Sequence, residues 1–345
     1  MINLARIGLI AGISGLLSLP SAVRADEAAA IARIAGAVYL GDIPTAVADK
    51  FSIFQSNGVQ AVVEYSESGQ RSLARLRSGD VDFALMALTP FVLDRLADPD
   101  PGQPEDPIIL ASLVHSGELT RLFYRDDAGI DGPADLVGKR IAVQCGTNTD
   151  FALWLFLQFH GVDPGSVRRQ CVDFGRTAQV LKTGRVDAAV LPDPWSFDAD
   201  RSEAGASAVS TFDLRRIYTG SWVLVTTRHV VEGHLTRASR ILAAYLDAID
   251  LTENSPDQAL EAYNARPFVP APVSREQWEA LDFDVTLTWA LISAIRQQLD
   301  WARSTGAEGS DQLVAVLDLI DPRPLRQLQP HRVDIPVRLN EAPAR

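Results

Sequence analysis

The chain has 345 residues, of which 47% are hydrophobic and 22% charged, so it can bury a sizeable core and is neither disordered nor fibrous. Its 44 acidic residues outnumber 32 basic ones and give a net charge of -12, the wrong sign for holding a phosphate backbone. Nucleic acid is therefore not an expected partner. Two cysteines and five histidines offer too little for a zinc or iron-sulfur framework, so we expect no metal and no cofactor.

Residues 1–25 have the parts of a secretory signal peptide. Arg6 gives a positive start, residues 7–19 are an uncharged apolar run, and Val23 and Ala25 are the small residues that precede a cleavage site. The run is too short to span a bilayer, which needs about 20 apolar residues. We therefore expect residues 1–25 to be removed and the mature protein to be exported without a membrane anchor.

A repeat offset by 105 residues indicates two units of similar plan. Residues 76–85 read Leu-Arg-Ser-Gly-Asp-Val-Asp-Phe-Ala-Leu and match residues 181–190, Leu-Lys-Thr-Gly-Arg-Val-Asp-Ala-Ala-Val, while Gly41 matches Gly146 at the same offset. Around each copy, short apolar strands alternate with helices. This alternation predicts parallel strands joined by crossover helices.

Each half is predicted to run strand, helix, strand, helix, strand. In the first half these elements are 31–39, 44–55, 60–65, 70–77 and 81–85. In the second half they are 140–144, 149–160, 167–173, 177–182 and 186–191. Further strands are predicted at 120–124 and 222–226, and helices at 238–249, 256–264, 275–281 and 285–303.

The order of these elements predicts an α/β fold with two lobes, each a mostly parallel sheet flanked by helices. The chain is expected to build lobe 1 from residues 30–118 and 229–320, with its C-terminal helices packed on that lobe, and lobe 2 from residues 119–228. Residues 321–345 hold five of the 20 prolines and are predicted to form a tail that straps across the surface or stays mobile.

Cys145 and Cys171 each lie on or at the end of a predicted strand. In an oxidising compartment, a disulfide between neighbouring strands is one interpretation. Two buried thiols are an alternative. A third is a nucleophilic Cys145, because it leads into a helix start that would lower the pKa of its thiol.

The candidate ligand-binding residues lie in loops between a strand and the following helix, where open α/β sheets bind ligands. Helix starts there suit small anions. Two tryptophans could form a planar wall, two aspartates could accept from an amine, and two arginines occupy matching loops; core packing, turn caps and solvated surface are the alternatives. No catalytic motif occurs, so no catalytic residue is predicted. The candidates are Asp42, Gln70, Arg71, Thr89, Gly146, Thr147, Asn148, Arg176, Asp193, Trp195 and Trp222.

Five short segments follow one another in a characteristic order. They are Leu-Arg-Ser-Gly-Asp-Val-Asp at 76–82, Asp-Leu-Val-Gly-Lys-Arg-Ile-Ala-Val-Gln at 135–144, Gly-Val-Asp-Pro at 161–164, Gly-Arg-Val-Asp-Ala-Ala-Val at 184–190 and Asp-Pro-Trp at 193–195. Together they resemble the family of periplasmic binding proteins for nitrate, sulfonates, taurine and thiamine pyrimidines. The resemblance covers about residues 30–265.

This resemblance implies a two-lobed, monomeric periplasmic receptor that closes on a small molecule and presents it to an ABC permease in the inner membrane. It places ligand loops at Asp42, Gln70, residues 146–148 and residues 193–195. An acidic residue at position 42 departs from the pattern of family members that bind simple anions. The alternatives are a ligand-sensing subunit for a membrane signalling partner, or an enzyme of the family, desulfinase or pyrimidine-synthase-like. Neither enzyme's cysteine arrangement matches the two cysteines here.

Overall fold

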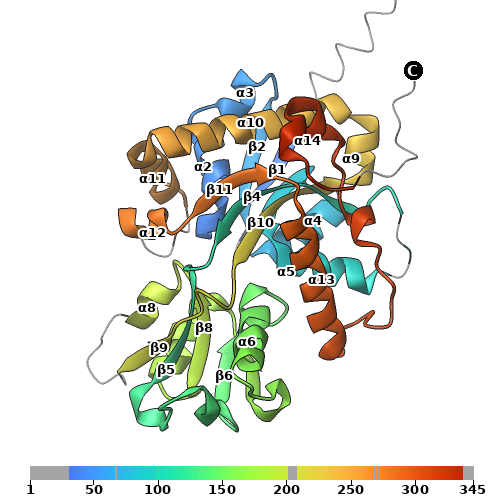
Figure 1. Ribbon diagram of the computed structural model, residues 1–345. Coiled ribbons are helices and arrows are strands. Elements are labelled where there is room, and N and C mark those ends of the chain that lie inside the picture. Colours follow the sequence, from blue (N-terminus) through green and yellow to red (C-terminus); the bar gives the residue numbers. More distant parts are fainter. Residues whose placement is uncertain are drawn as a thin grey trace, which may run out of the picture.

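The computed structural model describes residues 31–336, apart from Glu67, Pro99, Pro101, residues 201–207, Phe268, Pro270 and Ala271. The predicted signal peptide lies outside the described residues, as does the end of the predicted tail. Two α/β lobes are stacked end to end (Figure 1). No helix in the described part of the chain is long and apolar enough to cross a membrane.

Lobe 1 is built on a six-stranded sheet with the order β11-β4-β10-β3-β1-β2. Strands β1, β2 and β3 pair in parallel, whereas β10, β4 and β11 pair antiparallel with their neighbours. Strand β3 is buried along its whole length, as expected for a strand covered on both faces. The strand bounds are β1 Ala32–Ala37, β2 Ala61–Ser66, β3 Phe83–Ala87, β4 Pro107–Ser116, β10 Gly220–Thr227 and β11 Asp282–Thr286.

Helices cover both faces of this sheet (Figure 1). From the N-terminal half they are α2 Ile43–Lys50, α3 Ile53–Ser56, α4 Gly69–Arg77 and α5 Leu88–Ala97. From the C-terminal part they are α9 Arg228–Gly233, α10 Leu235–Asn254, α11 Pro256–Asn264, α12 Arg275–Glu279, α13 Trp289–Ser304 and α14 Arg323–Leu328.

Lobe 2 is built on a five-stranded sheet with the order β7-β6-β8-β5-β9. Strands β7, β6 and β8 are parallel, and β5 pairs antiparallel with β8 and β9. The strand bounds are β5 Thr120–Arg125, β6 Arg140–Val143, β7 Arg168–Cys171, β8 Ala188–Pro192 and β9 Val209–Phe212. Its helices are α6 Asn148–Phe159, α7 Phe174–Lys182 and α8 Ser196–Asp200.

The predicted two-lobed α/β fold is confirmed, but the range predicted for lobe 2, residues 119–228, included β10, which belongs to the lobe 1 sheet, and the strand directions also differ. Each sheet is mixed rather than mostly parallel, because the strands next to the lobe connections run antiparallel to their neighbours: β4 and β10 in lobe 1, β5 and β9 in lobe 2. The predicted helix at 285–303 is in fact the end of β11 followed by α13.

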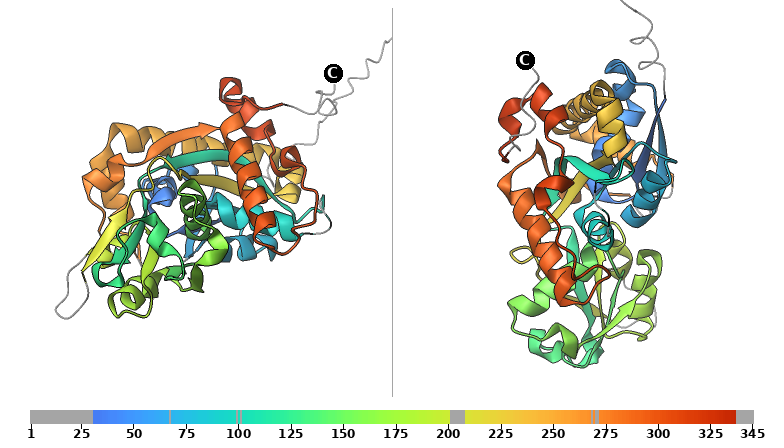
Figure 2. Two further views of the ribbon diagram at one scale, coloured as in Figure 1. Left: turned by 60° about the horizontal axis from the view of Figure 1, so that its bottom comes forward. Right: turned by 90° about the vertical axis from the view of Figure 1, so that its right-hand side faces the viewer.

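The C-terminal part of the chain packs on lobe 1. Ile320 bridges to Ile109 of β4, and Val333 bridges to Leu287. Leu325 of α14 is fully buried. The described residues of the predicted tail therefore contribute to the core of this lobe. Figure 2 shows α13 running along the side of lobe 1 toward lobe 2.

Candidate functional site

A narrow cavity lies where the two lobes meet. About 20 Å³ of it is open to the centre of a water molecule, which is room for one or two waters. Its walls come from the starts of α4, α5, α6 and α7 and from the residues after β1 and β8, so both lobes contribute. The lining residues are Tyr39, Ser68, Gly69, Ala87, Pro90, Thr147, Asn148, Phe174, Pro192, Asp193, Trp195 and Trp222.

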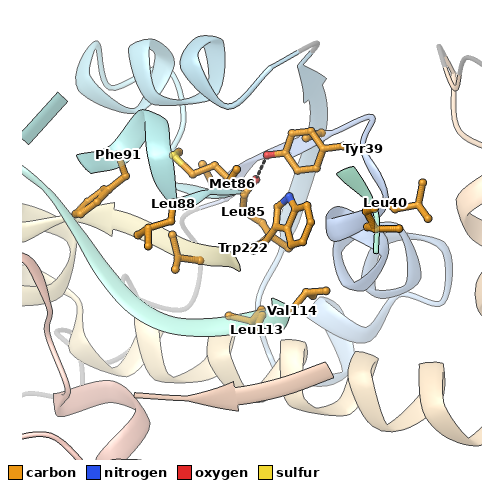
Figure 3. Close-up of a cluster of buried hydrophobic side chains, with 14 of the residues drawn as sticks. Tyr39, Leu40, Leu85, Met86, Leu88, Phe91, Leu113, Val114 and Trp222 are labelled. Carbon is orange, nitrogen blue, oxygen red and sulfur yellow. Dashed lines mark hydrogen bonds between the residues drawn. The ribbon is translucent and has the colours of Figure 1, made fainter. Parts of the chain in front are cut away.

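Each lobe brings a pair of aromatic rings to the cavity. In lobe 1 the ring centroids of Tyr39 and Trp222 are 6.3 Å apart, and in lobe 2 those of Phe174 and Trp195 are 4.9 Å apart. The Tyr39 hydroxyl donates to the Leu85 carbonyl at 2.9 Å, which fixes this ring against β3 (Figure 3). Such paired rings form planar walls suited to an organic ligand.

The Trp222 ring rests directly on the backbone of Gly41. A Cβ atom at residue 41 would lie 2.1 Å from the Trp222 ring, so only glycine lets the ring lie here. Gly41 belongs to a single 3-10 turn, Leu40–Asp42, that leads from β1 into α2. The loop after β1 therefore supports one wall of the cavity.

Polar groups reach the cavity at the helix starts of both lobes. The Ser68 hydroxyl caps α4 by accepting from the Arg71 amide at 3.3 Å, and the Thr147 hydroxyl caps α6 by accepting from the Thr149 amide at 3.4 Å. Burial raises the pKa of the Tyr218 hydroxyl, and a hydrogen bond with the Asn148 side chain opposes that rise. Ser68, Thr147 and Asn148 therefore place polar side chains in a lining that is otherwise largely apolar.

Asp193 is the acidic residue of the lining. Its carboxylate accepts hydrogen bonds from the Ser196 hydroxyl and from Arg121 Nη2, the latter at 3.3 Å. The Asp193 side chain is 7% exposed. Arg121 thus balances part of the charge that Asp193 would present to a ligand.

One side chain links the lobes across the rim of the cavity. Gln70 Nε2, on α4, lies 3.3 Å from the Cys145 carbonyl and 3.4 Å from the Gly146 carbonyl of lobe 2. Gly146 has φ +70°, and a Cβ there would lie 2.8 Å from Gln70 Nε2. A disulfide between Cys145 and Cys171 ties this loop to the end of β7.

Asp42 lies beneath the wall rather than in the cavity. It is fully buried, and its carboxylate accepts from the Ala37 amide and the Thr45 hydroxyl, both at 2.5 Å, and from Arg266 Nη1 at 3.3 Å. Burial raises the pKa of Asp42 to about 7, with Arg266 working against the rise. The expected ligand contact at Asp42 is therefore an internal ion pair in this structure.

Three other candidates also lie outside the cavity lining. Arg71 and Arg176 are exposed, because both sit in the first turn of a helix on the side that faces solvent. Thr89 is buried inside the start of α5. The structure therefore brings together Thr147, Asn148, Asp193, Trp195 and Trp222 in the lining, with Gln70 and Gly146 at the rim.

Seven of the twelve lining residues were missing from the candidate set, and three of them, Tyr39, Ser68 and Phe174, carry aromatic or hydroxyl side chains. Tyr39 lies two residues after β1, Phe174 is the first residue of α7, and Ser68 immediately precedes α4. Their positions after strands were a usable signal, since ligand loops lie there. What the sequence does not show is that these three residues line one cavity.

Two facing α/β lobes with a cavity at the carboxyl ends of their strands define the periplasmic-binding-protein fold. The structure resembles the periplasmic aliphatic sulphonate binding protein SsuA from Escherichia coli, with TM-score 0.67 and 16% identity over 82% of this chain and 97% of that one. It equally resembles the alkanesulfonate-binding protein SsuA from Xanthomonas axonopodis pv. citri bound to MOPS, with TM-score 0.68 and 15% identity over 85% and 98%. The desulfurization enzyme DSZB is similar too, with TM-score 0.64 and 16% identity over 88% and 99%.

Residues 31–265 match the NMT1-like family, and the chain belongs to that family. The resemblance found in the sequence is thereby confirmed. A putative ABC transporter periplasmic binding protein from Brachyspira hyodysenteriae is 30% identical over 131 residues, which are 37% of this chain and 36% of that protein. The match therefore spans about a third of that curated relative.

Proposed function

We propose that the protein is the solute-binding component of an ABC importer, exported to the periplasm, which captures a small organic molecule between its lobes and presents it to a membrane permease. The observation that carries this proposal is the cavity itself, because aromatic and polar residues of both lobes line one space. Membership of the NMT1-like family and the name of the curated relative support it.

The size of the cavity supports capture by movement of the lobes. Space for one or two waters admits no larger molecule, so the lobes must part before a ligand enters. On closure, the two aromatic pairs meet the ligand from opposite sides, and Gln70 reaches the carbonyls of lobe 2. A micromolar dissociation constant requires about -8 kcal/mol, which a few hydrogen bonds and buried rings can supply.

The lining favours a planar organic ligand that carries hydrogen-bond donors. Among the described residues, no arginine or lysine lines the cavity, so a simple anion would depend on the helix starts alone. Asp193 is placed to accept from an amine or amide of the ligand. We propose binding without bond chemistry, since Cys145, the nucleophile candidate, is joined to Cys171 in a disulfide.

Native mass spectrometry of protein purified from its own periplasm tests this function by weighing the bound molecule. A thermal-shift screen of sulfonates, nitrate, carboxylates, amines and pyrimidines then ranks ligand classes, and we expect planar amines or pyrimidines to stabilise most. Trp195→Ala and Trp222→Ala should each weaken binding and remove part of the fluorescence change on ligand addition. Steady turnover of the bound molecule would contradict a binding-only role, and affinity unaltered by either substitution would contradict the aromatic walls.

A further inference from the structure

Within the described residues, two short crossovers connect the lobes. Residues 117–119 lie between β4 and β5, and residues 213–219 lie between β9 and β10. The crossovers run close together, because a Cβ added to Gly117 would lie 3.2 Å from the Arg215 carbonyl oxygen and 3.8 Å from that of Tyr218. Any rotation of one lobe against the other takes place here, since the chain passes between the two sheets at these points.

A cluster of four aromatic residues packs against the second crossover. Its centre is Phe151 of α6, whose ring centroid lies 6.0 Å from Tyr218, 6.3 Å from Trp154 and 5.3 Å from Trp301. We name Phe151, Trp154, Tyr218 and Trp301 the hinge cluster. It joins three parts of the molecule, because Phe151 belongs to lobe 2, Tyr218 to the crossover, and Trp301 to α13 on lobe 1.

The hinge cluster is linked to the cavity through α6. Asn148, which begins this helix, lines the cavity and is hydrogen-bonded to Tyr218, and Phe151 follows on the next turn. On the other side, α13 packs along α5, whose first residues also line the cavity. Helix α13 lies beyond residue 265, where the match to the NMT1-like family ends.

The Trp301 ring of α13 packs against the Phe151 ring of α6, so it forms a contact between the lobes. Beyond it lies a groove of about 420 Å³ between the last residues of α13 and the flank of α6. Trp301 itself is 3% exposed, so its ring is buried at the point where the two helices approach. The Trp301–Phe151 contact joins α13 to α6, and the views agree that α13 reaches lobe 2 there (Figures 1 and 2). The groove is lined by Asp150, Leu153, Trp154, Leu157, Gln158, Asp163, Pro164, Gly165, Val167, Arg169, Trp301, Ser304 and Thr305.

We propose that α13 is a brace for the hinge. Trp301, seated on Phe151, holds lobe 2 against lobe 1 and shifts the equilibrium between open and closed arrangements toward the closed one. This inference rests on the proposed function, in which closure captures the ligand. Trp301 is a positioning residue, because it sets affinity through lobe closure and touches no part of the cavity.

The distance between the lobes in ligand-free protein tests the brace. Nitroxide labels on Arg71→Cys and Arg176→Cys, which are exposed and each lie two residues beyond a lining residue, report that distance by pulsed electron spin resonance. Trp301→Leu should raise the ratio of open to closed molecules about twofold to tenfold, the range expected for loss of one aromatic contact. Trp289→Leu is the matched control, since Trp289 begins the same helix but is 50% exposed.

Phe151→Leu removes the lobe 2 side of the same contact and should shift the distances between the labels in the same direction. A folded Trp301→Leu protein with the wild-type distance distribution would overturn the brace, and so would an equal shift in the Trp289→Leu control. If Trp301→Leu does not fold, an unaltered distribution in Phe151→Leu overturns it. Because these measurements need no ligand, a failure to find any bound solute would sink the proposed function and leave the brace standing.

Discussion

Gly41→Ala probes the support of the tryptophan wall. The added Cβ would lie 2.1 Å from the Trp222 ring, whereas carbon atoms in contact stay about 3.5 Å apart, so the ring must move by about 1.4 Å. Overpacking of this kind costs about 1 to 3 kcal/mol. Since three ring atoms clash, we expect a value near 3 kcal/mol and a ring displaced into the cavity.

Guanidinium denaturation followed by tryptophan fluorescence measures the loss of stability, and native mass spectrometry measures retention of the bound solute. Gly175→Ala is the control, because nothing lies within 4 Å of a Cβ at that exposed helix start. Helix propensity should make this control neutral or slightly stabilising, by up to about 1 kcal/mol. Replacing Trp222 by leucine in the Gly41→Ala background should restore much of the stability. Wild-type stability and solute retention in Gly41→Ala would refute the steric reasoning.

Three further predictions concern the disulfide, a buried acid and the link across the rim. Replacing Cys145 and Cys171 by alanine should lower the free energy of unfolding by about 3.5 kcal/mol, from the entropy of a loop with sequence separation 26, and an unchanged guanidinium midpoint would contradict this. Burial raises the pKa of Asp42 to about 7, so between the unfolded value of about 3.9 and pH 7 the folded state binds the extra proton. The stabilisation that this group contributes is therefore fully present below about pH 4 and is lost as the pH rises to 7. Asp42→Asn should flatten this pH dependence of the unfolding free energy, measured by denaturation at pH 4 to 8. An unchanged pH dependence in Asp42→Asn would show that other groups cause it. Gln70→Ala removes hydrogen bonds between the lobes that are worth about 0.5 to 1.5 kcal/mol. The variant should therefore release the co-purified solute about twofold to tenfold faster in stopped-flow fluorescence. Gln179→Ala, a change at an exposed residue of α7, should leave the release rate unchanged.

The internal repeat predicted two lobes of similar plan because its residues make the same contact between strands in each lobe. The repeated aspartates, Asp82 and Asp187, each accept from the backbone amide of a neighbouring strand, from Arg33 at 2.8 Å and from Arg140 at 2.9 Å. In both lobes this contact joins the start of the third predicted strand to the start of the first. A local sequence pattern therefore carried information on pairing between strands.

Strand β4 was missed because it offers no periodic pattern. Its ten residues, Pro107–Ser116, are almost all buried, since β10 and β11 flank it and helices cover the sheet. A continuous apolar run of this kind does not alternate, and periodicity alone cannot separate it from a buried helix. Without β4 and β11, the antiparallel half of the lobe 1 sheet was not predictable.

The residues of the cavity were also only partly predictable from the sequence, as two aspartates show. Asp42 and Asp193 both follow a strand and stand close before a proline, so sequence treats them alike. The structure separates them through Arg266, which is 224 positions from Asp42 along the chain and stacks 3.9 Å above the Tyr263 ring. This buried cation draws the Asp42 carboxylate into the core, because an unpaired charge there would be costly. The acid left in the cavity lining is Asp193, so the chemistry offered to a ligand was decided by a distant partner that no local pattern could reveal.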